Sequence, residues 1–263
     1  MTNRAVQLAI DNGGVARVTL NRPDKHNAFD DAIIAELTEV FSSLANNNAV
    51  RAMVLAANGK SFSAGADLGW MQRMANYSYE ENLRDAQGLA EMLKCLDTLP
   101  FTTIARVQGA AFGGAVGLVS CCDLAIGTPR ASFSLSEVKI GLVPATISPY
   151  VVAAIGRRAA RRYFQTAERF KADAALQLGL LSAVVEENAL DSEIDAMIDT
   201  VLANSPQAVR LAKQLVVDVA DRPVTEQLIQ ETCELIASIR VSEEGQEGLT
   251  AFLDKREPAW LTK

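Results

Sequence analysis

Short apolar strands alternate with amphipathic helices along the first 189 residues, and this pattern constrains the fold more than any other feature of the chain. Strand-like spacing occurs in Val6–Ile10 and Val15–Leu20, which flank the turn residues Asp11–Gly14. Helical spacing follows over Ala28–Asn46, and Ala52–Ala57 has the character of a short buried strand. The order of these elements predicts an α/β fold that begins with a hairpin.

The alternation continues as far as Val185. Strands are expected over 103–107, 123–127, 132–135 and 184–185, and helices over 78–98, 114–121, 149–155, 159–166 and 171–176. From Leu190 to Leu253 we expect only helices, divided near Ser205–Pro206 and Arg222–Pro223. The sequence therefore predicts an α/β core over 1–189 and, over 190–263, a helical region of the kind that docks on another subunit.

Charge and hydropathy exclude several classes of partner. The 25 basic and 32 acidic residues give a net charge of -7 without a long run of one sign, which argues against nucleic acid or an anionic membrane surface as a partner. The uncharged stretch 107–122 is rich in glycine and shorter than the roughly 20 residues of a spanning helix. The first ten residues show no secretory signal, so we expect a cytoplasmic protein.

The motifs of several common chemistries are absent from the sequence. Cys95, Cys121, Cys122 and Cys233 have no C-x-x-C spacing, so we expect reduced thiols and no metal site. No dinucleotide-binding, P-loop or zinc-protease pattern occurs. The single histidine, His26, lies in a polar loop and no G-x-S-x-G is present, which argues against a serine–histidine triad.

Two glycine-containing turns each follow a short apolar strand and lead into an expected helix. They are Ser61–Leu68, after strand 52–57, and Gly109–Gly114, after strand 103–107. Small residues allow a ligand to approach the backbone, and amides at the start of a helix point outward with a partial positive charge. Either turn alone is typical of close packing. Two turns that face each other would form an oxyanion hole.

Four motifs in this order resemble the crotonase (enoyl-CoA hydratase/isomerase) superfamily, over essentially the whole chain. The motifs are Asn21–Pro23 with Asn27–Ala28, Ser63–Leu68, Gly109–Gly114 followed by Cys122–Asp123, and Phe133–Glu137 followed by Gly141–Pro144. The resemblance implies an α/β spiral of repeated β-β-α turns with a helical C-terminal trimerisation region. It also implies a homotrimer or a hexamer that binds an acyl-CoA thioester.

The resemblance assigns roles to single residues. The amides of Ala66 and Gly114 are expected to bind the thioester oxygen, and Glu137 to move a proton. Each such amide is worth about 3 kcal/mol of barrier. Residues implied around CoA and the acyl group are Lys25, Ala28, Ala64, Asp67, Leu68, Gly113 and Gly117, with Phe252 and Lys255 from a neighbouring subunit. For the two lysines, a solvated surface role remains open. CoA is part of the substrate, and no separate cofactor is expected.

The chain departs from the family pattern at two places. Family hydratases commonly use two glutamates, and the first falls on Gly117, which leaves Glu137 alone. One carboxylate can serve both halves of a syn hydration, but it also suits the proton transfer of a Δ3,Δ2-enoyl-CoA isomerase. Residues 144–150 replace the glycine-rich turn of much of the family, so we expect a reshaped acyl pocket.

Residues 67–71, 77–84 and 144–150 resemble the bacterial branch that hydrates 3-methylglutaconyl-CoA in leucine breakdown, or a longer isoprenoid analogue. A distal carboxylate requires a cation, and Arg73 and Arg84, in the helix after the first glycine turn, are candidates. We therefore expect a hydro-lyase acting on a branched, carboxylated enoyl-CoA. The isomerase is the alternative. A second alternative is a non-catalytic relative that binds acyl-CoA or RNA. The acidic balance argues against RNA binding, and the retained Glu137 argues against a non-catalytic role.

Overall fold

The computed structural model describes residues 4–261. Residues 1–3 and 262–263 lie outside the described residues. The prediction that the first ten residues carry no secretory signal therefore falls partly on residues outside this range. The chain forms two compact units, Met1–Leu99 with Thr103–Asp195 and Pro100–Thr102 with Ala196–Lys263. These boundaries lie near the expected regions 1–189 and 190–263. The roles given to the two regions, acyl-CoA binding and assembly, stay predictions.

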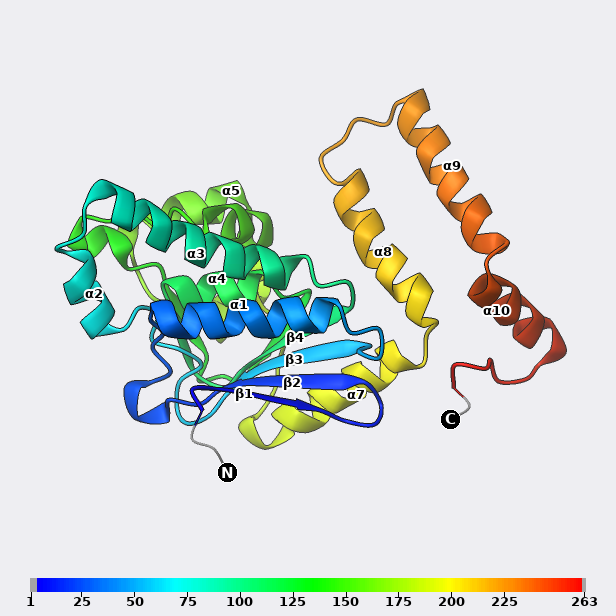
Figure 1. Cartoon of the computed structure of the whole chain (residues 1–263), viewed down its shortest axis with the longest axis horizontal. Coiled ribbons are helices and arrows are strands. Elements are labelled where there is room, and N and C mark those ends of the chain that lie inside the picture. Colours follow the sequence, from blue (N-terminus) through cyan, green and yellow to red (C-terminus); the bar gives the residue numbers. More distant parts are fainter. Residues whose placement is uncertain (1–3, 262–263) are drawn as a thin grey trace. The chain divides into compact units, whose positions relative to one another are not determined.

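A six-stranded sheet runs through the first unit (Figure 1). β1 and β2 form the expected hairpin, in which Val6 pairs with Leu20, and the pairs β2–β3, β4–β6 and β6–β9 are parallel. The strands of this sheet, in spatial order, are β1 (Val6–Ile10), β2 (Val15–Leu20), β3 (Ala52–Ala57), β4 (Thr102–Val107), β6 (Leu124–Gly127) and β9 (Ala183–Val184). Continuous burial along β3 is typical of a parallel sheet covered on both faces.

Two amphipathic helices pack side by side in this unit, α1 (Asp31–Ala45) and α3 (Tyr79–Asp97) (Figure 1). α1 begins after Asp30, whose side chain accepts a hydrogen bond from the Ile33 amide. α3 begins with a capping box formed by Ser78 and Glu81. Both helices therefore start where the sequence supplies a capping residue.

A second, smaller sheet contains β5 (Ala110–Phe112), β7 (Ser132–Ser134) and β8 (Phe170–Lys171). Only β7 was expected as extended, because β5 lies within the predicted turn Gly109–Gly114 and β8, with two residues, is too short to show alternation. The predicted turn Gly109–Gly114 thus contains a strand, which pairs in parallel with β7.

The remaining helices of this unit are α2 (Leu68–Met74), α4 (Gly114–Ser120), α5 (Ser148–Thr166) and α6 (Ala172–Leu178), with 3-10 turns η1 (Pro23–Lys25), η2 (Glu137–Ile140) and η3 (Glu187–Ala189). α5 contains the two predicted helices, 149–155 and 159–166, which meet at a kink where Gly156 has a φ of +75° and a ψ of 157°. The expectation that one helix carries both candidate arginines is wrong. Arg73 lies in α2 and Arg84 in α3, because Ser78 starts a new helix.

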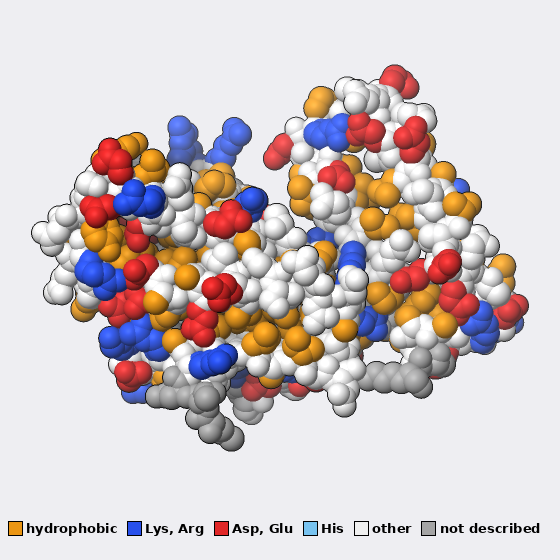
Figure 2. All heavy atoms as spheres, viewed as in Figure 1, with side chains coloured by type: hydrophobic (Ala, Val, Ile, Leu, Met, Phe, Trp, Pro, Cys, Tyr) orange, Lys and Arg blue, Asp and Glu red, His pale blue; other side chains and the backbone are white. Residues whose placement is uncertain are grey.

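Four helices follow η3: α7 (Leu190–Leu202), α8 (Pro206–Val219), α9 (Glu226–Arg240) and α10 (Glu243–Asp254). The predicted divisions near 205–206 and 222–223 are present, and Ser242 starts one further helix. Hydrophobic side chains are exposed on the second unit (Figure 2), among them Val216 and Val217 at 65% and 67%. No helix within residues 4–261 is long and apolar enough to cross a membrane.

Candidate active site

The two glycine-containing turns and Glu137 meet at one cavity of about 440 Å³ in the first unit. Ala66 comes from the first turn, Gly114 from the second, and Glu137 from the start of η2. The structure therefore brings together the three residues expected to act on a thioester. The other walls come from α2, α3 and nearby loops: Phe29, Trp70, Met74, Asn82, Asp85, Ala86, Leu89 and Gly141, Leu142, Val143, Pro144, Ala145, Thr146 and Ile147.

The backbone around Ala66 is fixed by its pairing with Phe29. The Phe29 amide donates to the Gly65 carbonyl at 2.9 Å, and the Asp67 amide donates to the Phe29 carbonyl at 2.9 Å. This pairing does not use the Ala66 amide. Gly65 has a φ of +87°, and a Cβ there would lie 2.6 Å from the Phe112 carbonyl oxygen. Glycine is therefore required for the close approach of this turn to β5.

The two turns are also bonded to each other. The Ser63 amide donates to the Ala110 carbonyl, and the Phe112 amide donates to the Ser63 carbonyl, both at 3.0 Å. Gly109 allows another close approach, since a Cβ there would lie 2.0 Å from the Lys60 carbonyl oxygen. Amides held at a fixed spacing by such bonds need no rearrangement when charge develops on a bound oxygen.

The second candidate amide belongs to Gly114, the first residue of α4. An amide at this position has no partner within its own helix. The preceding residue, Gly113, has a φ of +52° and donates its amide to the Ser134 carbonyl at 2.9 Å. A Cβ at Gly114 would lie 2.7 Å from Cζ of Phe29, so the aromatic ring closes against the backbone at this point.

Glu137 places a carboxyl group beside the second turn. A Cβ at Gly113 would lie 3.2 Å from Glu137 Oε1. The other oxygen, Oε2, is buried and has no hydrogen-bond partner within residues 4–261. Burial raises the pKa of Glu137, and a hydrogen bond from its own backbone amide opposes this only in part. A half-buried carboxyl with a raised pKa and one buried, unbonded oxygen is suited to general acid–base catalysis.

Gly117 lies inside α4 and is fully covered. A Cβ at this position would lie 2.4 Å from Cγ2 of Ile147 and 3.3 Å from Cδ2 of Leu93. Ile147, not Gly117, lines the cavity. Since Ile147 belongs to the segment 144–150, the two departures noted in the sequence meet in one structural feature: an aliphatic side chain covers position 117, where the resemblance implies a first glutamate.

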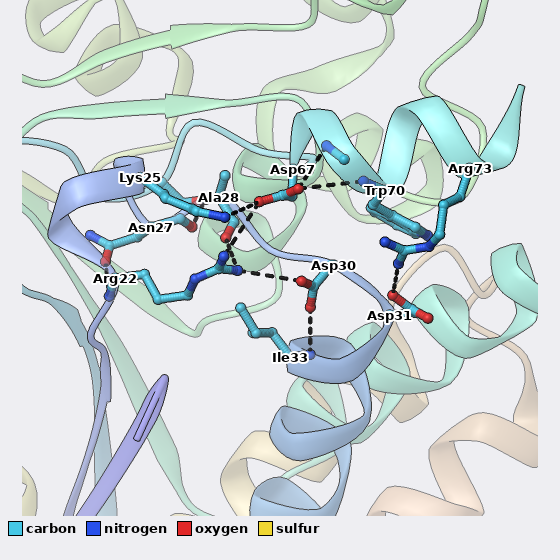
Figure 3. A network of polar contacts seen from close by, with 12 residues as sticks. Arg22, Lys25, Asn27, Ala28, Asp30, Asp31, Ile33, Asp67, Trp70 and Arg73 are labelled. Atoms are coloured by element: carbon cyan, nitrogen blue, oxygen red, sulfur yellow. Dashed lines mark hydrogen bonds and ion pairs between the residues drawn. The ribbon is translucent and has the colours of Figure 1, made fainter. Parts of the chain in front are cut away.

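Asp67, one of the residues implied around CoA, is bonded within the protein (Figure 3). Its carboxylate accepts from the Gly69 and Trp70 amides at the start of α2 and pairs with Arg22 at 3.4 Å and Lys25 at 3.6 Å. Burial acts to raise its pKa, but these hydrogen bonds and the two cations lower it overall. Asp67 therefore holds the first turn in place.

The other implied CoA residues lie outside the cavity lining. The side chains of Ala64, Leu68 and half-exposed Lys25 reach solvent, whereas Ala28 is buried. The Ala64 amide donates to the His26 carbonyl at 2.9 Å, so the backbone of the first turn lies against the loop that carries Lys25 and Ala28. In the second unit, Phe252 is 82% exposed and Lys255 ends α10 in the left-handed conformation.

The arginines considered for a distal carboxylate do not line the cavity. Arg73 pairs with Asp31 (Figure 3), and Arg84 borders a separate groove between α1 and α3. Among the described lining residues there is no lysine or arginine, and the ionisable ones are Asp85 and Glu137.

Asp85 was missed from the sequence. It lies in α3, and its Oδ1 accepts a hydrogen bond from Trp70 Nε1 at 3.0 Å. Asn82, Asp85, Ala86 and Leu89 have the spacing i, i+3, i+4 and i+7, so one face of α3 forms part of the cavity wall. That spacing was the signal in the sequence that could have placed Asp85 on the inner face.

Comparisons with known proteins agree with this arrangement. A family model described as enoyl-CoA hydratase/isomerase matches residues 11–263. The crystal structure of an enoyl-CoA hydratase from Shewanella pealeana is 49% identical and superposes with a TM-score of 0.94, covering 98% of this chain and 96% of that one. (E)-benzylidenesuccinyl-CoA hydratase of Thauera aromatica is 32% identical, covering 94% of this chain and 95% of its own length. Short-chain-enoyl-CoA hydratase of Clostridium acetobutylicum is 31% identical over a match that covers 93% of this chain and 93% of that protein.

The expected α/β fold with a helical C-terminal region is confirmed.

Proposed function

The chain belongs to the enoyl-CoA hydratase/isomerase family and is a hydratase-type lyase, and we propose that it adds water across the 2,3 double bond of a branched enoyl-CoA. The observation that carries this proposal is the cavity shared by the Ala66 and Gly114 backbone and the buried Glu137 carboxyl. Two amides would bind the thioester oxygen, and one carboxyl would handle protons beside it.

In the proposed reaction, Glu137 accepts a proton from water while the water oxygen bonds to the β-carbon. Negative charge then moves to the thioester oxygen, where the amides of Ala66 and Gly114 stabilise it. Glu137 returns the proton to the α-carbon, which completes a syn addition. A raised pKa favours this double role, because the carboxyl must release its proton as readily as it takes it.

A carboxylated acyl group, such as that of 3-methylglutaconyl-CoA, is the finer form of the proposal. The relative named for benzylidenesuccinyl-CoA, itself a carboxylated enoyl-CoA, supports it. The described lining does not, because it offers Asp85 and Glu137 and no cation. A branched acyl group without a carboxylate fits these residues better.

One observation favours an isomerase as the second candidate: Ile147 lies against Gly117, the position to which the resemblance assigns a second acid. Glu137 alone could remove a proton from C2 of a 3-enoyl-CoA and return it at C4. A non-catalytic acyl-CoA-binding or RNA-binding role leaves the buried, unbonded Oε2 of Glu137 unexplained, since burying such an atom costs stability.

Turnover in H₂¹⁸O decides between the two reactions. The purified protein should incorporate ¹⁸O at the β-carbon when supplied with crotonyl-, 3-methylcrotonyl- or 3-methylglutaconyl-CoA, and we expect the highest kcat/KM for the branched, uncharged thioester. Conversion of 3-hexenoyl-CoA with α-proton exchange and no ¹⁸O uptake would instead establish the isomerase. Faster turnover of 3-methylglutaconyl-CoA than of 3-methylcrotonyl-CoA would establish the carboxylated substrate.

We also propose a homotrimer or hexamer in the cytoplasm, in which Phe252 and Lys255 reach the CoA of a neighbouring subunit. The exposed apolar side chains of the second unit support assembly. CoA enters as part of the substrate, and the proposed reaction needs no separate cofactor and no metal.

A further inference from the structure

We propose that Asp85 determines which acyl groups the cavity accepts: its carboxylate favours a neutral hydrogen-bond donor, such as a hydroxyl, and disfavours a second carboxylate. This inference rests on the proposed acyl-CoA function and specifies the chemistry of the acyl group. Asp85 acts here on the choice of ligand, and Glu137 on the reaction.

The position of Asp85 in the wall is fixed from two sides. Its backbone belongs to the 19-residue helix α3, and its Oδ1 accepts a hydrogen bond from Trp70 Nε1 at 3.0 Å. The Trp70 side chain is itself buried, with 4% of its surface exposed. Asp85 is therefore held in the wall of the cavity, beside the apolar side chains of Met74 and Leu89.

The polar atoms that remain available on this wall are acceptors. Oδ2 of Asp85 takes part in no hydrogen bond with residues 4–261. On the neighbouring Asn82, Nδ2 donates to the carbonyls of Tyr77 at 3.2 Å and Ser78 at 3.1 Å, which leaves Oδ1 as its unused atom. Asn82 is exposed and Asp85 is half-buried, so Oδ2 of Asp85 is the acceptor on this wall that a donating ligand group would match.

Charge gives a second, independent reason. A carboxylated acyl group would bring a third carboxyl into a cavity that already holds Asp85 and Glu137 and whose described lining has no lysine or arginine. Burial raises the pKa of Asp85, and the charge of Asp31 adds to this, against the Trp70 hydrogen bond and Arg73, which lower it. The site already disfavours the negative charge of Asp85, and the carboxylate of an acyl group nearby would be disfavoured further.

Binding of saturated thioesters tests the inference without the reaction. Hexanoyl-, 6-hydroxyhexanoyl- and adipyl-CoA match in length and end in a methyl, a hydroxyl and a carboxylate. By calorimetry on the full-length protein, the hydroxylated ligand should bind severalfold more tightly than hexanoyl-CoA, and adipyl-CoA at least tenfold more weakly. Asp85→Asn keeps the acceptor for Trp70 but replaces the charged oxygen with a donor. In this variant the ratio of the adipyl-CoA Kd to the hexanoyl-CoA Kd should fall by tenfold or more.

Glu91→Gln is the matched control, because it removes one negative charge from the same helix. Glu91 lines the groove between α1 and α3, which Asp85 also borders, but not the cavity. The control should keep the wild-type ratio. Equal binding of adipyl- and hexanoyl-CoA by the wild type, or an unchanged ratio in Asp85→Asn, would overturn the inference. If no enoyl-CoA is hydrated while the binding pattern holds, the proposed reaction fails and the role of Asp85 stands.

Discussion

At the scale of single residues, Glu137 combines burial, an unused oxygen and a place beside two turn amides. Glu137→Gln preserves the shape of the side chain but cannot accept a proton. We expect kcat to fall by about 10²- to 10⁴-fold, which is the usual contribution of a general base, with little change in the Kd of a saturated acyl-CoA. Exposed Glu80→Gln is the control and should keep wild-type kcat. Retention of more than a tenth of the activity in Glu137→Gln would remove Glu137 from this role.

The raised pKa of Glu137 also predicts how stability depends on pH. Between the unfolded-state value of 4.5 and the higher folded-state value, the folded protein binds more protons than the unfolded chain, so this group destabilises the fold increasingly as pH rises through that window. Glu137→Gln should therefore have a higher Tm than the wild type at pH 8, and the difference should shrink at pH 4. Thermal melts at the two pH values check this, and a gap that widens on acidification would contradict it.

Gly117 and Ile147 should be coupled in their effect on stability, since a Cβ at Gly117 would lie 2.4 Å from Cγ2 of Ile147. Gly117→Ala should cost about 1–3 kcal/mol of unfolding free energy, the usual range for overpacking. The double variant with Ile147→Gly should lose less stability than the sum of the two single variants, because Ile147→Gly removes Cγ2 and Cβ, which would lie 2.4 and 2.9 Å from a Cβ at position 117. Denaturant titration of the two single variants and the double variant measures the coupling, and additive effects would show that the contact is absent.

The same pair offers a test of the missing acid. Gly117→Glu in the Ile147→Gly background has room for its Cβ, and we expect it to hydrate crotonyl-CoA faster than the Ile147→Gly single variant does. Gly117→Glu alone should be destabilised and gain no such activity, because a buried unpaired carboxylate is costly.

At the scale of elements, α2 depends on Asp67, which caps its first turn and pairs with Arg22 and Lys25. Asp67→Ala should lower the free energy of unfolding by about 1 kcal/mol or more through loss of the cap. Asp67→Asn keeps a good capping side chain and loses only the ion pairs, so it should be the milder variant. Urea titrations at low and high salt separate the two contributions. Equal losses of unfolding free energy in Asp67→Ala and Asp67→Asn would show that the helix cap contributes nothing.

The elements also show how far the sequence could predict the fold. The bounds of β1, β2 and β3 match the predictions, because turn residues set off β1 and β2 and because β3 is an apolar run of six residues. β5 and β8 have three and two residues and depend on partners far along the chain, which no local pattern records. Gly156 has a non-helical conformation, so the predicted break divides α5 into two helices that meet at a kink.

The candidate site was predicted through resemblance and not through geometry. Ala66, Gly114 and Glu137 were named from motifs, and the structure places them at one cavity. Two features could not be read from the motifs. The contact of Ile147 with Gly117 joins positions 30 apart, and the inward placement of Asp85 depends on where α3 begins.

At the scale of the whole molecule, the exposed apolar side chains of α8 predict self-association. Light scattering at micromolar concentration should give a mass of three or six times 28.2 kDa. Val217→Asp should lower this mass, because it places a charge on an apolar surface that assembly would bury. Gln214→Asp, at an exposed polar position on the same helix, should leave the mass unchanged. A monomer in the wild type would remove the proposed role of the second unit in assembly.

The cover that Ile147 places over Gly117 restricts the mutational routes between one-acid and two-acid members of this family. A glutamate cannot enter position 117 while Ile147 is present, since its Cβ would overlap Cγ2 of that side chain. The order of substitutions is therefore constrained: position 147 must shrink first, at a cost of roughly 2–5 kcal/mol for loss of a buried isoleucine, before the acid is tolerated. Lineages that carry an isoleucine here would be held to single-carboxylate chemistry by epistasis, even where selection favours a second acid.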